Sequence, residues 1–390
     1  MELKSENKVW FAQALRGIAA LSVVIYHLCG KFWMSNDAIS SIMFLKPAKN
    51  ISLFYIPFLN FLESKNLDMG SFGVGLFFLI SGFVIPISIE KLNVKEFLTR
   101  RIFRIYPTYV IGLLISCIFL FLYALINKQS YPISFSHFAI NASLLRDWFN
   151  IVSIDYSNWT LEIEIKFYIF AILLAVLFKL RNAKALIGCT LLMTLSNLLY
   201  AGYYQYLVLH ALRFRLAYLI SFNSVFLMFM LMGVCIYNLF KNYWSLKKFI
   251  VIIGIIYIEF FVSVLFGPCS TSKWIYIIPY TLAIITFLTC YFVRNKLKYN
   301  KFIDSVSNIS YPMYVVHAVS GYVTLSIMFS ITQNAYVSIL VAAVVFVTLA
   351  VLLHKFVELP TNRFGKNLFK HNAKITSVKQ AKPISKGSIS

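Results

Sequence analysis

Residues 71–90 read SFGVGLFFLISGFVIPISIE, an apolar stretch whose one formal charge is its last residue. A helix of about 20 such residues is long enough to cross the hydrocarbon core of a bilayer. The rest of the chain has the same character: of its 390 residues, 60% are hydrophobic and only 13% are charged. A soluble domain carries about 25% charged residues. The composition therefore excludes an ordinary soluble enzyme and predicts an integral membrane protein.

Nine further windows have a similar length and hydropathy. Several contain Gly, Pro or a polar side chain, which spanning helices tolerate where neighbouring helices satisfy the freed polar groups. The windows cover residues 10–30, 106–126, 159–178, 185–203, 216–239, 249–267, 274–293, 309–329 and 335–355. We therefore predict an all-α polytopic membrane protein with about ten transmembrane helices.

The basic residues predict the orientation of these spans. The chain has 36 Lys and Arg against 14 Asp and Glu. With the N-terminus inside, 26 of the basic residues fall in inner segments and 9 in outer segments, as the positive-inside rule requires. Both termini are therefore predicted to be cytoplasmic, with the loops 31–70 and 127–158 outside. On so apolar a chain, the positive charge indicates anionic lipid as a partner and no nucleic acid.

The chain is predicted to divide into a membrane domain, residues 1–363, and a tail, residues 364–390. The tail is rich in Lys and Ser and has almost no apolar periodicity, a composition typical of disordered segments. We therefore expect a basic, disordered cytoplasmic extension. The cysteines show no C-x-x-C spacing, so no metal site is predicted.

The first span contains two ionisable residues, Arg16 and His27. Eleven residues make about three helical turns, so both side chains share one face and lie about 16 Å apart along the axis. Ionisable groups within a span are costly unless they are paired or face a cavity. The pattern indicates a functional face. The alternative is that Arg16 reaches to the lipid headgroups and His27 has a packing role.

An arginine cluster, TRRIFRIYP at residues 99–107, precedes the third window. Arg101 and Arg104 are three residues apart and share a helical face. Guanidinium groups at the cytoplasmic surface suit a phosphate-rich ligand. An anchor of the positive-inside kind would explain the same residues, and the spacing does not separate the two interpretations.

The fourth span opens with NWTLEIEIKFY at residues 158–168. Glu162 and Lys166 are four residues apart and could neutralise one another, whereas Glu164 has no such partner. Its predicted depth is similar to that of His27. A carboxylate and an imidazole at one depth could form a general base and its orienting partner; an interfacial salt bridge is the competing interpretation.

Two late motifs place further ionisable residues at the spans. SYPMYVVH, residues 310–317, puts His317 inside the ninth span, and FVELP, residues 356–360, puts Glu358 at the inner end of the tenth. Together with R-x10-H in the first span, GVGLFFLISGF, RRIFRIYP and WTLEIEIKFY, these motifs follow one another across residues 10–363. In this order they closely resemble the signature of acyltransferase family 3. Any one motif is weak, but six in order are specific.

The resemblance implies roles for these residues. His27 and Arg16 correspond to the catalytic motif of the family, and Glu164 to the acid of its W-S-L-x-x-E-x-x-F-Y motif. The segment of Arg101, Arg104 and Tyr106 resembles the part that handles acyl-CoA. Two departures, Thr160 for Ser and Glu162 for a small residue, leave Glu162 as an alternative acid. Further candidates in the motifs are Trp159, His317 and Glu358.

The family consists of membrane acyltransferases, many of which O-acetylate extracytoplasmic glycans. The resemblance therefore implies a membrane O-acyltransferase of a bacterial inner membrane, with acetyl-CoA or another acyl-CoA as donor and His27 as general base. The expected acceptor is a sugar hydroxyl of a cell-surface polysaccharide, such as O-antigen or capsule, or of its lipid-linked precursor. The chain shows no SGNH-type domain, so any second, periplasmic acyltransferase would be a separate partner. The alternatives are acylation of a lipid or small molecule, and a non-enzymatic transporter of lipid-linked glycans.

Overall fold

The computed structural model describes residues 10–48 and 57–380, and this part of the chain is helical, without β-strands. The long helices are α1 (Trp10–Ile25), α5 (Met69–Lys91), α6 (Val94–Asn127), α9 (Trp159–Phe178), α10 (Ala183–Gly202), α12 (Ala211–Phe240), α13 (Leu246–Phe266), α14 (Lys273–Phe292), α16 (Ser310–Thr332), α17 (Ala335–Leu353) and α18 (Leu359–Gln380). The shorter helices are α2 (Phe32–Met34), α3 (Asn36–Met43), α4 (Pro57–Ser64), α7 (Phe135–Ala142), α8 (Arg146–Phe149), α11 (Tyr204–Val208) and α15 (Lys301–Asn308). Four single turns, η1 (Tyr26–Lys31), η3 (Tyr156–Asn158), η4 (Ser270–Ser272) and η5 (His354–Glu358), complete the order.

Within the described residues, nine helices are long and apolar enough to cross a membrane. Each of them overlaps one predicted window, and the chain is an all-α polytopic membrane protein. The tenth window, 159–178, is also a helix, α9. It differs from the nine because Glu162, Glu164 and Lys166 lie within its first half. These charges are tolerated because they contact protein partners and cavities, as described below.

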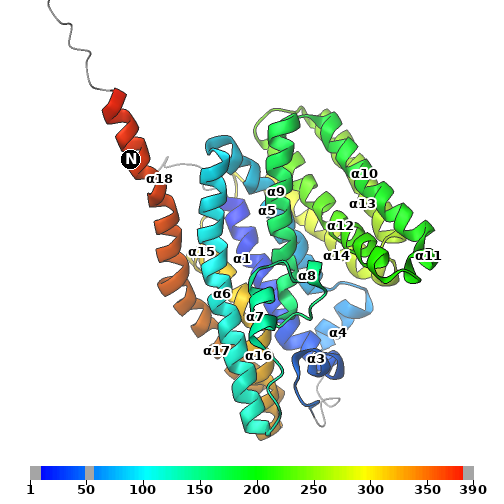
Figure 1. The fold of residues 1–390 in the computed structure, drawn as a ribbon, viewed down its shortest axis with the longest axis vertical. Coiled ribbons are helices and arrows are strands. Elements are labelled where there is room, and N and C mark those ends of the chain that lie inside the picture. Colours follow the sequence, from blue (N-terminus) through cyan, green and yellow to red (C-terminus); the bar gives the residue numbers. More distant parts are fainter. Residues whose placement is uncertain (1–9, 49–56, 381–390) are drawn as a thin grey trace, which may run out of the picture.

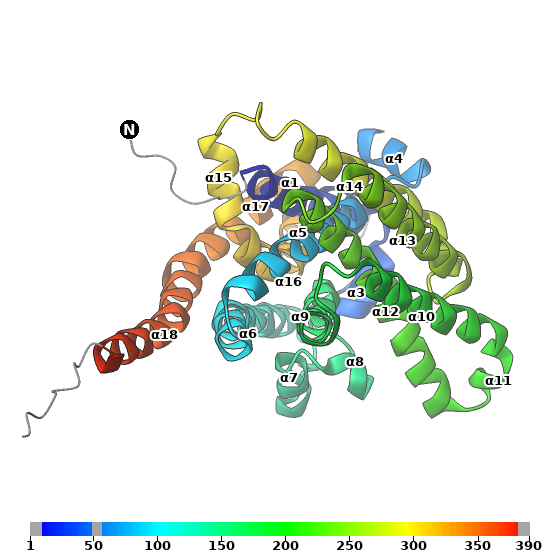
Figure 2. The ribbon, with the colours of Figure 1, turned by 90° about the horizontal axis from the view of Figure 1, so that it is seen from above.

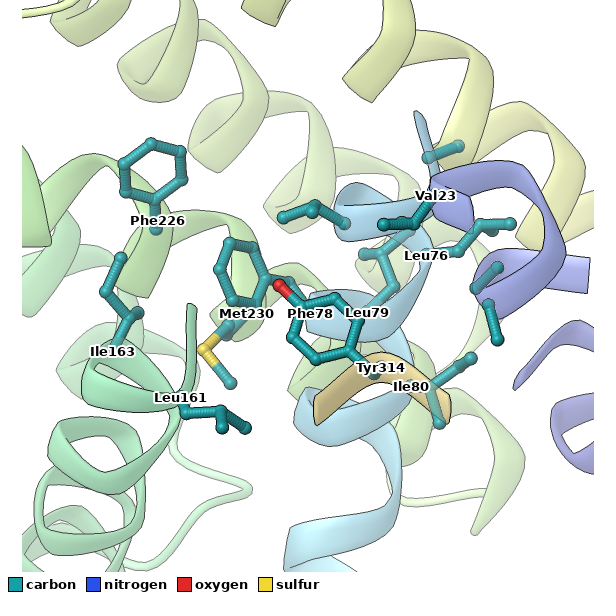
Figure 3. Close-up of a cluster of buried hydrophobic side chains, with 14 of the residues drawn as sticks. Val23, Leu76, Phe78, Leu79, Ile80, Leu161, Ile163, Phe226, Met230 and Tyr314 are labelled. Carbon is teal, nitrogen blue, oxygen red and sulfur yellow. The ribbon is translucent and has the colours of Figure 1, made fainter. Parts of the chain in front are cut away.

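Helix α5 is the centre of the bundle, and α1, α9, α12 and α14 pack around it. Figure 3 shows part of the core, in which Leu76, Phe78 and Leu79 of α5 meet Phe226 and Met230 of α12. A glycine pair permits the closest of these approaches: a β-carbon on Gly82 would lie 1.9 Å from the carbonyl oxygen of Met230, and one on Gly233 would lie 2.8 Å from the α-carbon of Gly82. Small residues of this kind let membrane helices approach backbone to backbone.

The two ends of the bundle carry different elements (Figures 1 and 2). The short helices α3 and α4 lie at the lower end of Figure 1, whereas α18 leaves the bundle at the upper end. By the predicted orientation, the lower end faces outward and the upper end faces the cytoplasm. Helix α16 packs along α17, α6 and α1 and so brings the SYPMYVVH motif beside the first span.

The predicted tail is partly ordered into helix. Helix α18 continues from the last span, and its first turns pack on α6, where the rings of Phe103 and Phe364 lie 5.1 Å apart. Residues 364–380 are therefore helical, contrary to the expectation of an irregular tail, because apolar residues in the first turns have a surface to pack against. Residues 381–390 lie outside the described part of the chain.

Candidate active site

A series of three adjoining cavities runs through the bundle past the residues that the motifs pick out. The first, the inner cavity, has a volume of about 340 Å³ and is lined by Arg16, Arg100, Arg101, Arg104, His354, Glu358 and Lys366, among others. The second, the neck, is only about 80 Å³. The third, the outer cavity, is about 560 Å³ and is lined by His27, Tyr156, Trp159, Glu162 and residues of the outer loops.

Shared lining residues show that the three cavities are neighbours. Arg16, Arg104, Ser310 and Tyr311 line both the inner cavity and the neck. Val74 and Tyr314 line both the neck and the outer cavity. The cavities therefore adjoin in series from the arginine cluster, by way of a narrow segment with both polar and apolar lining, to the histidine of the first span.

The inner cavity is rich in cations, and three of them form no ion pair in the part of the chain that the structure describes. Arg101 donates to the hydroxyl of Ser88 at 2.9 Å, and its guanidinium lies over the rings of Phe97 and Tyr168 at 5.4 and 5.3 Å. Arg100 is paired with Glu96 on its own helix. Within the described residues, Arg16, Arg101 and Arg104 form no ion pair. Such unpaired guanidinium groups favour a ligand with several negative charges.

The neck holds Glu164 together with Arg16 and Arg104. One carboxylate oxygen of Glu164 accepts hydrogen bonds from Ser81 at 3.0 Å and from the phenol of Tyr168 at 2.6 Å. Glu164 does not line the outer cavity. The similar depth predicted for Glu164 and His27 suggested a general base with its orienting partner, but the two side chains line different cavities. Glu164 points toward Ser81 of α5 in the neck, which lies on the inner side of the cavity that contains His27.

Glu162 is the acid of this motif that lines the outer cavity with His27, beside Glu63, Asp68 and Asp147, and it belongs to an ion pair. Arg146 of α8 donates to both of its carboxylate oxygens, at 2.7 and 3.1 Å. The expected Glu162–Lys166 pair does not form. Lys166 instead contacts the carboxylate of Asp147 and the amide oxygen of Asn223. Sequence reasoning missed Arg146 and Asp147, although two adjacent opposite charges in an outer loop were the available signal.

His27 lies in a widened helical turn, η1, where the first span changes from α to π geometry. Such turns occur often at functional sites. The Nδ1 atom of His27 is hydrogen-bonded to the phenol of Tyr322 on α16. The ring of His317 lies 5.0 Å from that of His27, edge to face. The ninth span thus supplies two groups around His27, and no motif pointed to Tyr322.

His317 has a defined tautomer. Its Nδ1 is 2.7 Å from the carbonyl oxygen of Tyr314, which can only accept, so Nδ1 carries the proton. Nε2 then presents a lone pair, and it is buried without a hydrogen-bond partner in the described structure. A buried nitrogen atom without a partner beside His27 is able to accept a hydrogen bond from a ligand.

The remaining predicted residues are divided between the cavities and the surrounding structure. Trp159 lines the outer cavity and packs on Phe226, with ring centroids 5.0 Å apart. Glu358 pairs with His354 at 2.7 Å in a second π turn, η5, at the inner cavity. Tyr106 is directed elsewhere, because its phenol donates to the carbonyl of Ser143 and it lines none of the three cavities.

Comparison with known proteins shows the family to which the chain belongs. The family model for acyltransferase family 3, described as an acyltransferase domain, matches residues 9–355. A protein of Acidianus two-tailed virus, whose name proposes that it is an acetyltransferase, is 26% identical over 318 residues, which are 78% of this chain and 80% of the viral protein. No solved structure matches the chain. The family match includes both the inner arginine cluster and the His27–Tyr322–His317 group, and the chain belongs to acyltransferase family 3.

Proposed function

We propose that this membrane acyltransferase takes an acyl group, most simply acetyl, from acyl-CoA at the inner cavity and transfers it to a hydroxyl group in the outer cavity. The observation that carries the proposal is the series of adjoining cavities, with unpaired arginines at one end and His27 at the other. As a family member the chain is an enzyme, and the transporter alternative is set aside.

The donor is expected to bind with its phosphates in the inner cavity. Arg101 and Arg104 would form charge-assisted hydrogen bonds to them. The uncharged arm of the coenzyme would then extend through the neck. There Arg16, Glu164 and the phenols of Tyr311 and Tyr314 offer hydrogen-bonding groups to its amides. Only a thin, extended chain fits a neck of about 80 Å³.

His27 is proposed to act as the general base. For Nε2 to accept a proton, Nδ1 must carry one and donate it to the oxygen of Tyr322, the contact that the structure contains. The acceptor hydroxyl gives its proton to His27 while its oxygen attacks the thioester carbonyl. The carbon–sulfur bond then breaks, and the coenzyme thiolate leaves and takes the proton. Catalysis of this kind contributes about 10²–10⁴-fold.

The acceptor is proposed to be a sugar of a cell-surface polysaccharide or of its lipid-linked precursor. Aromatic residues line the outer cavity, among them Tyr156, Trp159 and Tyr276, beside carboxylates and arginines. Stacking surfaces next to hydrogen-bonding groups suit a polyhydroxylated ring. This assignment places the chain in the plasma membrane of a bacterium, where any further transfer would need a separate envelope acyltransferase.

The test is an assay with the purified protein in lipid nanodiscs, acetyl-CoA labelled in the acetyl group, and sugar acceptors. Label should move to an acceptor oxygen, and His27→Ala should abolish the transfer. In cells, NMR of the surface glycan should show an O-acetyl signal that is lost with His27→Ala. Transfer that proceeds equally well with His27→Ala would contradict the proposed base. Label transferred to an acceptor amine would contradict an O-acyltransferase.

A further inference from the structure

An apolar groove, here called the side groove, lies on the flank of the bundle next to the outer cavity. It is about 430 Å³ in volume and is formed by α9, α10 and α12, with Phe170, Leu192, Met193 and Leu227 among its lining residues. A second hollow of about 290 Å³ between α10, α11 and α12 continues it, because Ser196 and Ile220 line both. Figure 2 shows α10 and α12 together on this flank.

The side groove faces the lipid. Leu192 is 67% exposed and Ile220 is 55% exposed, and both belong to helices that cross the membrane. By the predicted orientation α9 enters the membrane from outside at Trp159, so Lys166 and Phe170 lie two to three turns below the outer surface. The groove is therefore at the depth of the outer leaflet.

The side groove adjoins the outer cavity. Leu219 and Asn223, one turn apart on α12, line both of them. Side chains alone, Asn223 among them, therefore separate the groove from the cavity that contains His27.

The place where the two hollows meet is polar. Lys166 lines the groove, Asp147 lines the outer cavity, and the two form an ion pair that Asn223 extends by a 2.9 Å hydrogen bond. Charged groups at this depth are costly and commonly serve a substrate path. One oxygen of Asp147, Oδ1, is buried without a hydrogen-bond partner in the described structure. A buried carboxylate oxygen without a donor is what a hydroxyl group of a ligand would satisfy.

We propose that the acceptor is an amphiphile that enters sideways from the membrane, with its hydrocarbon chain in the side groove and its hydroxylated head in the outer cavity. This inference rests on the proposed function and deepens it, because it assigns the acceptor to lipid-linked sugars and glycolipids rather than to free glycans. Side-chain movement at the Lys166–Asp147 pair would let the head pass, and there the unpartnered carboxylate oxygen of Asp147 would accept a hydrogen bond from it before its sugar reaches His27.

The groove is expected to position the acceptor rather than to increase its affinity by much. Lipid tails are as apolar as the groove, so moving a chain from the bilayer into it releases little hydrophobic free energy. Its effect is to hold the head in one orientation and at a high local concentration. Filling the groove should therefore raise the KM for a long-chain acceptor without changing the use of a soluble one.

The first experiment compares two acceptors with the same sugar head, one on a long isoprenyl phosphate chain and one on a methyl group. Leu192→Trp fills the groove, and Leu191→Trp is the matched control, since Leu191 lies on the same helix, is 58% exposed and does not line the groove. We expect Leu192→Trp to raise the KM for the long-chain acceptor at least tenfold. The KM values for acetyl-CoA and for the methyl glycoside should be unchanged, as should all values for Leu191→Trp.

The second experiment does not depend on turnover. A photoreactive isoprenyl phosphate, irradiated with the wild-type protein in nanodiscs and analysed by mass spectrometry, should label the segments around Phe170 and Leu192, and excess phosphatidylethanolamine should not displace it. Transfer that occurs without such labelling, or labelling lost to ordinary phospholipid, would overturn the groove and leave the proposed function standing. Labelling without any transfer would overturn the proposed function and leave the groove standing.

Discussion

The inner and outer cavities differ in the charges that line them. In the inner cavity Arg16, Arg101 and Arg104 remain without ion pairs. In the outer cavity Glu162 is matched with Arg146, and Asp147 with Lys166. The inner cavity has several arginines against one glutamate, whereas the outer cavity carries both signs, with Lys31, Glu63 and Asp68 beside the two pairs. We therefore expect the proposed polyanionic donor at the inner cavity and an acceptor with little net charge in the outer cavity.

The largest expected effect is on the chemistry in the outer cavity. His27→Ala should lower the rate of acyl transfer by about 100- to 10,000-fold, because the general base is lost, while the affinity for acyl-CoA at the inner cavity persists. Turnover and coenzyme binding should be measured on the same preparation. His210→Ala, at an exposed histidine outside the three cavities, is the control. Loss of coenzyme binding with His27→Ala would mean that the two regions are not separate.

Arg146→Ala tests whether the Arg146–Glu162 ion pair stabilises the folded protein. It leaves Glu162, which is 3% exposed, as an unpaired charge, and breaking a buried pair costs about 3–5 kcal/mol. We expect a clear fall in the unfolding temperature in detergent. Replacing both partners, Arg146→Met with Glu162→Leu, should recover most of it. Equal losses in the single and double variants would show that the pair is not the source of the stability.

Asp155, in the predicted outer loop, should make the stability of the protein depend on pH. Its carboxyl group is 1% exposed, and burial raises its pKa to about 6, although Ser157 stabilises the carboxylate through two hydrogen bonds. Because the folded pKa lies above the unfolded value of about 3.9, the folded state binds more protons, and stability falls as the pH rises from about 4 to 6.

Asp155→Asn removes this ionisation. Relative to the wild type, the variant should gain about 2–3 kcal/mol of stability between pH 4 and pH 7, since about two pKa units are involved. Thermal unfolding of both proteins across this pH range measures the gain. A difference in unfolding temperature that stays constant with pH would contradict the raised pKa.

The smallest expected effect is at the inner cavity. Arg101→Ala or Arg104→Ala should each raise the KM for acyl-CoA about tenfold, or about 1.4 kcal/mol, and should make that KM less sensitive to salt, because fewer charges attract the phosphates. Arg181→Ala is the control, since Arg181 is an exposed inner cation that lies over the ring of Tyr243. If all three variants behave alike, the cluster serves only to orient the chain in the membrane.

Periodicity and hydropathy predicted the fold well, because each spanning helix needs a continuous apolar stretch that is visible in one window. The site was predicted only in part. The three adjoining cavities are lined by Arg16, Arg101, Arg104 and His27. Their depths follow from their positions along the spans, which the sequence shows. Depth alone could not show which way Glu164 points, and the partners of His27 on α16 depend on contacts between residues 295 positions apart. Tyr322 lies outside every recognised motif.

A passage that joins the two sides of a membrane is also a possible leak. The neck of about 80 Å³ has room for only a few water molecules, each of which occupies about 30 Å³ in the liquid. Two cations, Arg16 and Arg104, and one carboxylate, Glu164, line the neck. Moving one elementary charge across a potential of 100 mV releases about 2.3 kcal/mol, so the narrowness of the neck limits how much of the energy stored across the bilayer can be lost through the protein. The arm of the proposed donor, lying in the neck, would close the passage further.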